Sequence, residues 1–198
     1  MNDLAAFLQG ELKHRPSTIR AEWDARPAAV LVPLYQAHGT WHVLFTQRTH
    51  LVETHKGQVS FPGGRVDPED HDRVATALRE AEEELGLRRE DVTVLGQLDE
   101  LLTVTQYQIT PIVGTFAWPY DFVLSEAELS AVFGVPLAWL ADPRNLEIRY
   151  RDPLAGGRKV PVYYLHYDSY TIWGATARML LNLLDVLRPM LEDAPGAG

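Results

Sequence analysis

The sequence contains no cysteine among its 198 residues. This absence excludes thiol nucleophiles, disulfide bonds and cysteine-ligated zinc, and it removes any sign of an oxidising compartment. Basic residues are also scarce, because 18 Lys and Arg stand against 27 Asp and Glu and leave a formal net charge of −9. A general nucleic-acid-binding protein needs a basic excess to replace phosphate counterions. We therefore expect no nucleic-acid partner.

Long hydrophobic runs are absent as well. The longest uncharged stretch, residues 101–120, contains two prolines and several threonines and glutamines, so it predicts strands and turns instead of a membrane span. The N-terminal residues carry neither the basic segment nor the long apolar segment of a secretory signal. These features predict a cytoplasmic protein without a membrane partner. The sequence does not indicate an oligomeric state.

The composition, with 46% hydrophobic and 23% charged residues, is that of a packed globular protein. We expect a helical extension over residues 1–25, one domain over residues 26–190 and a flexible tail over residues 191–198. Within the extension, apolar residues spaced as on one helix face predict a helix over residues 3–13.

The main domain alternates irregularly between strand-like and helical patterns. Residue spacing predicts helices over residues 73–85, 125–133 and 171–188, with Gly86 as the C-cap of the first. Apolar runs predict strands at residues 29–35, 41–46, 92–98, 101–104, 109–116 and 160–166. This order predicts an α+β fold with a mixed sheet between helices.

An acidic turn of the helix over residues 73–85 is the strongest chemical feature. Glu80, Glu83 and Glu84 occupy positions i, i+3 and i+4, which places three carboxylates on one helix face. A solvated acidic face is the plain interpretation of such a turn. The alternative is a site for Mg²⁺ or Mn²⁺, because hard cations prefer oxygen ligands and convert carboxylate repulsion into coordination. Arg79 is placed to pair with Glu83 one turn later.

A tight turn precedes this helix. Residues 61–64, Phe-Pro-Gly-Gly, include Gly63 and Gly64, whose lack of side chains lets a phosphate group approach the backbone. A plain structural turn is the alternative interpretation.

Residues 79–87, Arg-Glu-Ala-Glu-Glu-Glu-Leu-Gly-Leu, resemble the second half of the Nudix box. The first half differs, because the acidic residue six positions after Gly64 is Asp70 and the spacer from it to Arg79 is one residue longer than in the family. The resemblance implies an α/β/α sandwich around a mixed sheet and a metal-dependent diphosphatase. It also implies that Glu83 and Glu84 are metal ligands and that Glu80 is a further ligand or a base.

A second motif narrows the substrate. Residues 44–64 resemble, with matching spacing, the signature of the coenzyme A diphosphatase subfamily, which contains Arg48 and ends in Phe-Pro-Gly-Gly. Glu53 replaces the second arginine of that signature, and Phe45 and Thr49 are milder departures. Residues 132–137 and 172–177 also resemble this subfamily. The implied reaction converts coenzyme A to 4′-phosphopantetheine and 3′,5′-ADP.

An anionic substrate needs cationic side chains, and three candidates lie close to the motifs: Arg48, Lys56 and Arg65. The sequence leaves the general base open among Glu83, Glu80, Glu100 and Glu128. Two other functions also remain open: a diphosphatase for ADP-ribose or another nucleotide, and a non-catalytic nucleotide-sensing module on the same fold.

Overall fold

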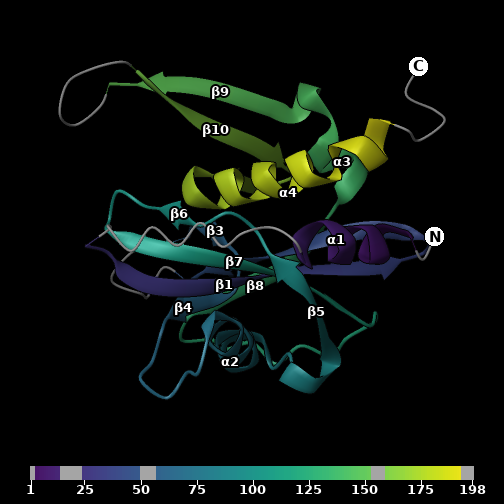
Figure 1. Cartoon of the computed structure of the whole chain (residues 1–198). Helices are drawn as coiled ribbons and strands as arrows, with labels where there is room; N and C mark the ends of the chain where they lie inside the picture. Colours follow the sequence, from purple (N-terminus) through teal and green to yellow (C-terminus); the bar gives the residue numbers. More distant parts are fainter. Residues whose placement is uncertain (1–2, 14–23, 50–56, 153–158, 193–198) are drawn as a thin grey trace.

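The computed structural model describes residues 3–13, 24–49, 57–152 and 159–192. An eight-stranded mixed sheet forms its centre (Figure 1). Helix α2 covers one face of this sheet, and α1 and α4 cover the other. The predicted α+β fold and the α/β/α sandwich are therefore confirmed.

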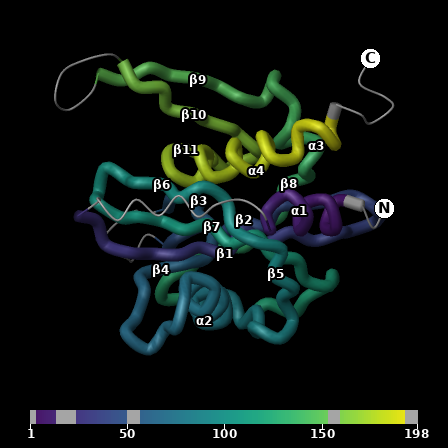
Figure 2. Tube along the Cα trace, in the orientation of Figure 1, coloured from purple at the N-terminus to yellow at the C-terminus, as the bar shows by residue number. Residues whose placement is uncertain are grey.

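The central sheet follows the order β3-β2-β1-β7-β5, with β4 paired to β1, β6 to β7 and β8 to β2. Strands β1 and β7 lie side by side (Figure 2) and run parallel. The other pairs among the described strands of this sheet are antiparallel. Eight consecutive residues of β1 are buried, because helices cover both faces of this central strand. The strands are β1 (Arg26–Ala37), β2 (Thr40–Arg48), β3 (Val59–Ser60), β4 (Gly63–Arg65), β5 (Val92–Gln97), β6 (Leu101–Leu102), β7 (Tyr107–Phe116) and β8 (Leu129–Pro136).

Helix α2 (Arg73–Leu85) has the predicted bounds. Asp72 caps its N-terminus by accepting a hydrogen bond from the backbone N–H of Ala75 at 2.7 Å. Gly86 ends it in the left-handed conformation, at φ 67°, as predicted. Its apolar residues, among them Ala77, Ala81 and Leu85, pack against the sheet.

The predicted helix over residues 125–133 is wrong, because residues 129–136 form strand β8. Val132 and Phe133 explain the error: their spacing with Leu129 also suits a helix, yet they pack on opposite faces of the sheet. The edge of β2 offers unpaired backbone groups to this segment, and the resulting ladder runs from His42 to Arg48. Tertiary pairing therefore overrode the local pattern.

The last predicted helix begins later than expected. Residues 170–173 form strand β11 (Tyr170–Trp173), and helix α4 (Gly174–Glu192) starts after it. Strand β11 belongs to a three-stranded antiparallel sheet with β10 (Val160–Tyr167) and β9 (Leu146–Arg151), which lies outside α4 in Figure 1. The sequence does not predict β9, since five of its six residues are exposed and give no apolar pattern.

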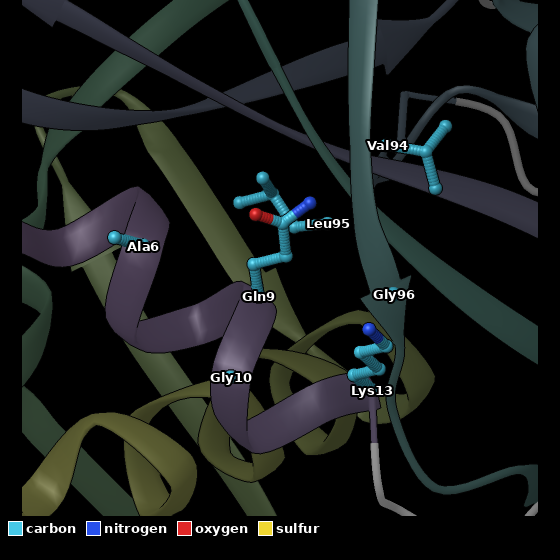
Figure 3. A pocket seen from close by; sticks show the side chains of 7 residues that line it. All are labelled: Ala6, Gln9, Gly10, Lys13, Val94, Leu95 and Gly96. Carbon is cyan, nitrogen blue, oxygen red and sulfur yellow. The ribbon is translucent and has the colours of Figure 1, made fainter.

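Helix α1 (Asp3–Lys13) confirms the predicted N-terminal helix and packs Leu4, Leu8 and Leu12 into the core beside α4. It presses so closely on β5 that a Cβ on Gly96 would lie 2.5 Å from the Cβ of Leu12. Figure 3 shows the groove that remains between the two elements, where Gly10 and Lys13 face β5.

The short elements are η1 (Arg89–Asp91), α3 (Leu137–Ala141) and η2 (Pro143–Asn145). In the described part of the chain, no helix is both long and apolar enough to cross a membrane. Residues 193–198 of the predicted tail lie outside the described residues, and residues 191–192 continue α4.

Candidate active site

The acidic face of α2 meets the glycine turn at the sheet margin. Glu84 is buried, and its Oε2 accepts a hydrogen bond from the backbone N–H of Gly63 at 3.3 Å. Gly64 lies against Glu80, because a Cβ at that position would be 2.3 Å from the Glu80 Oε1. A Cβ on Gly63 would lie 2.5 Å from the carbonyl oxygen of Ala29. Gly63 is therefore required by the close approach of its backbone to β1, whereas a side chain at position 64 would displace the Glu80 carboxylate.

The carboxylates at this margin repel one another. Burial, together with the charges of Glu128 and Glu80, raises the pKa of Glu84 to about 8, although Arg48 opposes the shift. Burial also raises the pKa of Glu80, again with a contribution from Glu128. A cation bound between these groups would stabilise their charged forms, so the electrostatics of the site favour a divalent metal ion.

Glu128 adds its charge to the site, since it raises the pKa of both Glu84 and Glu80 although it lies far from α2 in sequence. The segment before it attaches to the end of the helix, where Val123 and Ser125 donate backbone hydrogen bonds to the carbonyls of Leu85 and Glu84, each at 2.9 Å. These bonds satisfy carbonyl groups that a helix C-terminus leaves without partners. The sequence indicates Glu128 only as one candidate base, because no spacing rule relates it to α2.

Arg48, from the motif over residues 44–64, lies close to the carboxylate of Glu84. Its Nη1 lies 3.8 Å from Oε1 of Glu84, and only a quarter of the side chain is exposed. Its Nε is buried and has no hydrogen-bond partner among the described residues. The exposed quarter of the side chain leaves guanidinium N–H donors available to an anion.

Arg79 connects the loop to the helix. Its guanidinium donates hydrogen bonds to both carboxylate oxygens of Asp70, at 3.1 and 3.0 Å, and to the backbone oxygen of Arg65 at 3.1 Å. It also binds Oε1 of Glu80 at 3.0 Å and Oε2 of Glu83 at 3.1 Å. The predicted pairing of Arg79 with Glu83 is confirmed. Asp70 thus acts as the partner of Arg79, which holds the loop against α2.

Glu83 is the most exposed of the three predicted metal ligands, since 58% of its side chain is accessible. It turns to Arg79, and Glu80 is also engaged there. Within the described ranges, no three His, Cys, Asp or Glu side chains are gathered closely enough to hold a metal ion. The assignment of Glu80, Glu83 and Glu84 as metal ligands stays a prediction.

Glu100 lies beside the central sheet, before β6. It accepts hydrogen bonds from two side chains of β7, the hydroxyl of Thr110 at 2.9 Å and the amide of Gln108. Asn182 of α4 fixes the preceding residue, because its side chain bonds both the backbone N–H and the carboxylate of Asp99, each at 3.0 Å. Glu100 is consequently held in place by its own network.

Two predicted binding residues remain, Arg65 and Lys56, and the structure describes only Arg65. Arg65 is exposed and its side chain turns to β7, where its Nε donates a hydrogen bond to the hydroxyl of Tyr107 at 2.8 Å. Lys56 lies outside the described residues, as does Glu53.

Comparison with known proteins decides the family. A model of the NUDIX domain matches residues 25–153, which include the glycine turn, α2 and Glu128. The chain belongs to the Nudix family. The family identification confirms the resemblance drawn from residues 79–87, and hydrolases of this family generally use divalent metal ions.

Several curated relatives are similar over most of their length. The chain is 40% identical over 172 residues to the uncharacterized Nudix hydrolase NudL of Klebsiella pneumoniae and to that of Escherichia coli K12. Each alignment covers 85% of this chain and 86% of the relative. The predicted enzyme class, a Nudix hydrolase that acts on diphosphate bonds, is confirmed.

Solved structures agree on the fold. The Nudix hydrolase RenU of M. smegmatis superimposes with a TM-score of 0.52 at 18% identity, covering 83% of this chain and 88% of RenU. A MutT/nudix family protein from Enterococcus faecalis also superimposes with a TM-score of 0.52, at 13% identity. The superposition covers 96% of this chain and 70% of the E. faecalis protein. At these identities the likeness concerns the fold alone.

Proposed function

We propose that the chain hydrolyses the diphosphate bond of coenzyme A or a derivative of it, with Mg²⁺ or Mn²⁺ as cofactor. One observation carries this proposal: Arg48, from the coenzyme A motif, lies 3.8 Å from Glu84, from the Nudix box. Two motifs that are separate in sequence thereby supply one site with a cation and a carboxylate.

The pairing of β2 with β3 supports this arrangement. Thr46 lies opposite Ser60 and Gln47 opposite Val59, so the two ends of the motif over residues 44–64 come together. The Gly57 backbone N–H also bonds the carbonyl of Arg48 at 3.1 Å. The glycine turn and Arg48 consequently face the same end of α2.

A divalent cation held by Glu84 and its neighbours would offset the charge of the diphosphate and lower the pKa of a bound water. The chain itself supplies binding and proton transfer. Arg48 and the backbone of Gly63 and Gly64 would orient the phosphate groups. This role suits a protein whose net charge of −9 otherwise repels an anionic substrate.

The reaction consumes one water molecule. A glutamate accepts a proton from this water as the water oxygen attacks one phosphorus. The bond from that phosphorus to the bridging oxygen then breaks. The bridging oxygen leaves with the other phosphate. Glu80 is our first candidate for the base, because its raised pKa and partial burial favour proton uptake. Glu83, Glu100 and Glu128 are the alternatives.

Product analysis tests the proposal. The protein is incubated with coenzyme A and Mg²⁺ or Mn²⁺, and we expect 4′-phosphopantetheine and 3′,5′-ADP in equal amounts, with no turnover when a chelator is present. ADP-ribose and dinucleoside polyphosphates are assayed in parallel. A higher kcat/KM for ADP-ribose than for coenzyme A would replace the proposal with the alternative nucleotide diphosphatase.

A nucleotide-sensing module is the alternative outside enzymology. It predicts tight binding of the nucleotide without turnover under any metal condition. The presence of Glu80, Glu83 and Glu84 together argues against this alternative, since a module without catalysis has no need of all three.

A further inference from the structure

Two arginines flank one tyrosine ring at the end of the central sheet. The guanidinium carbon of Arg26 lies 4.5 Å from the ring centroid of Tyr107, and that of Arg65 lies 5.5 Å from it. Arg65 also donates its Nε–H to the Tyr107 hydroxyl at 2.8 Å, and Arg26 donates an Nη2–H to the carbonyl of Thr105 at 3.3 Å. The ring therefore holds both cations in fixed positions through cation–π contacts.

Neither arginine has an acidic partner in the part of the chain that the structure describes. Among the described residues, no carboxylate forms an ion pair with Arg26 or with Arg65, whereas Arg79, Arg88, Arg144 and Arg149 each have one. Both side chains are exposed, so a solute can reach them. Two like charges fixed near one another without a counter-ion repel, and a bound anion would relieve this repulsion.

The strand pairing places this pair of arginines next to the glutamate site. Arg65 follows Gly64, which lies against the carboxylate of Glu80. Arg26 lies opposite Tyr107 in the β1–β7 ladder. Arg79 connects the two places directly, since it binds the backbone oxygen of Arg65 and the carboxylate of Glu80.

The alternation of side chains separates the two sites by face. On β1 the even-numbered residues Val30 and Val32 face α4 and the odd-numbered Ala29 and Leu31 face α2, so Arg26 lies on the α4 face. The glutamates approach from α2. One substrate therefore has to extend across the sheet margin to reach both.

We propose that Arg26 and Arg65, held by Tyr107, form an anion site for a phosphate group of the substrate other than the diphosphate that is cleaved. The inference rests on the proposed function, because it concerns the same substrate. The site selects for compounds that carry a phosphate monoester beyond the diphosphate, as the 3′-phosphate of coenzyme A does. Guanidinium groups suit this role because their N–H donors match phosphate oxygens in bidentate geometry.

Two substrates that differ only in this phosphate test the inference. The kcat/KM of coenzyme A is divided by that of 3′-dephospho-coenzyme A, for the wild type and for Arg26→Gln and Arg65→Gln. We expect each substitution to lower this ratio about tenfold, the usual effect of one charge-assisted hydrogen bond. Arg26→Lys should recover part of the ratio because it keeps the charge. Arg144→Gln, which changes an exposed arginine paired with Asp142, is the matched control.

A binding measurement keeps the inference testable without turnover. Calorimetry compares adenosine 3′,5′-bisphosphate with adenosine 5′-monophosphate, and we expect the bisphosphate to bind the wild type about tenfold more tightly and the two glutamine variants without preference. If the wild type hydrolyses neither coenzyme A nor 3′-dephospho-coenzyme A, the proposed function fails. The binding comparison of the two adenosine nucleotides still tests the anion site in that case.

Two results would overturn the anion site. The first is an unchanged ratio and an unchanged preference in both variants. The second is an equal loss for both substrates together with a lower melting temperature, which would assign Arg26 and Arg65 a purely structural role on β1 and β4. Tyr107→Phe, which removes only the hydroxyl bonded to Arg65, should give a smaller fall in the ratio at an unchanged melting temperature.

Discussion

The guanidinium of Arg79 holds the carboxylate of Asp70 through two hydrogen bonds, Nε to Oδ1 at 3.1 Å and Nη2 to Oδ2 at 3.0 Å. The hydroxyl of Thr76 and the backbone N–H of Asp67 also donate to Asp70 Oδ2, each at 2.9 Å. Asp70, on a loop one residue longer than that of the family box, thus reaches the arginine that precedes the predicted catalytic glutamates.

Replacing Asp70 tests this contact. The Arg79 guanidinium holds the pKa of Asp70 well below its usual range, so the contact stabilises the fold above pH 4 and weakens as pH falls through the lowered pKa. We expect Asp70→Asn to lower the free energy of unfolding at pH 7 by about 2 kcal/mol, since it leaves buried donors without an anionic partner. Urea unfolding measures the change, and the difference between variant and wild type should shrink in strong acid.

Asp67→Asn is the control for Asp70→Asn. Asp67 lies 3.6 Å from the same guanidinium but is 59% exposed, so the change should stay within about 0.5 kcal/mol. An equal loss of stability in both variants would show that the loop's total charge matters, and not the two hydrogen bonds of Asp70.

The elements that sequence analysis predicted well carry strong local determinants. Helix α2 has a capping residue, Asp72, a terminal glycine, Gly86, and a regular apolar face between them. The segments that it predicted wrongly depend on partners remote in sequence. Strand β8 exists because β2 has an open edge, and strand β11 exists because β10 lies beside it.

The candidate site divides in the same way. The box over residues 79–87 indicated the glutamates, and the motif over residues 44–64 indicated Arg48. The closeness of Glu128 to Glu84 depends on backbone hydrogen bonds between a loop and the end of α2, which have no sequence pattern. The pairing of Arg26 with Tyr107 likewise depends on a parallel ladder between distant strands.

The pKa of Glu84 makes stability depend on pH. The folded protein holds this proton more tightly than the unfolded chain, whose glutamate has a pKa near 4.5, because burial and Glu128 raise the folded value to about 8. The stabilising contribution is complete below pH 4.5 and is lost as pH rises through 8. Without metal, Glu84→Gln should therefore be more stable than the wild type at pH 9, by roughly 4 kcal/mol, and should have no activity.

Thermal and urea unfolding in a chelator, from pH 5 to pH 9, measure this effect. Adding the metal should stabilise the wild type at pH 9 and leave Glu84→Gln nearly unchanged, because the charged carboxylate is the group that the cation stabilises. Glu82→Gln is the matched control, since Glu82 lies on the same helix but is 43% exposed and paired with Arg89. A wild-type stability that rises from pH 5 to pH 9 would contradict the assigned environment of Glu84.

Glu128 is predicted to share the metal with Glu84. Its charge raises the pKa of Glu84 and of Glu80, so Glu128→Gln should lower both and shift the loss of stability toward lower pH. We also expect about tenfold weaker activation by the metal, as for other residues around a metal centre. Titration of activity with Mg²⁺ measures the metal concentration that gives half-maximal activity. Glu126→Gln, two residues away and exposed, should behave as the wild type.

Two glycine-to-alanine substitutions compare a change in the candidate site with the same change in a helix outside it. A Cβ on Gly64 would lie 2.3 to 2.6 Å from the atoms of the Glu80 carboxylate, so Gly64→Ala displaces that group from the site. We expect kcat to fall about a hundredfold, since misplacement by about 1 Å has effects of this size.

Gly10→Ala adds the same methyl group to α1, where nothing lies within 4 Å of the new Cβ. It should stabilise the helix by about 0.5–1 kcal/mol and leave turnover unchanged, because alanine is the better helix former and the site is untouched. Activity assays and melting temperatures of the two variants therefore test whether the contact between the glycine turn and Glu80, and not added bulk, controls catalysis.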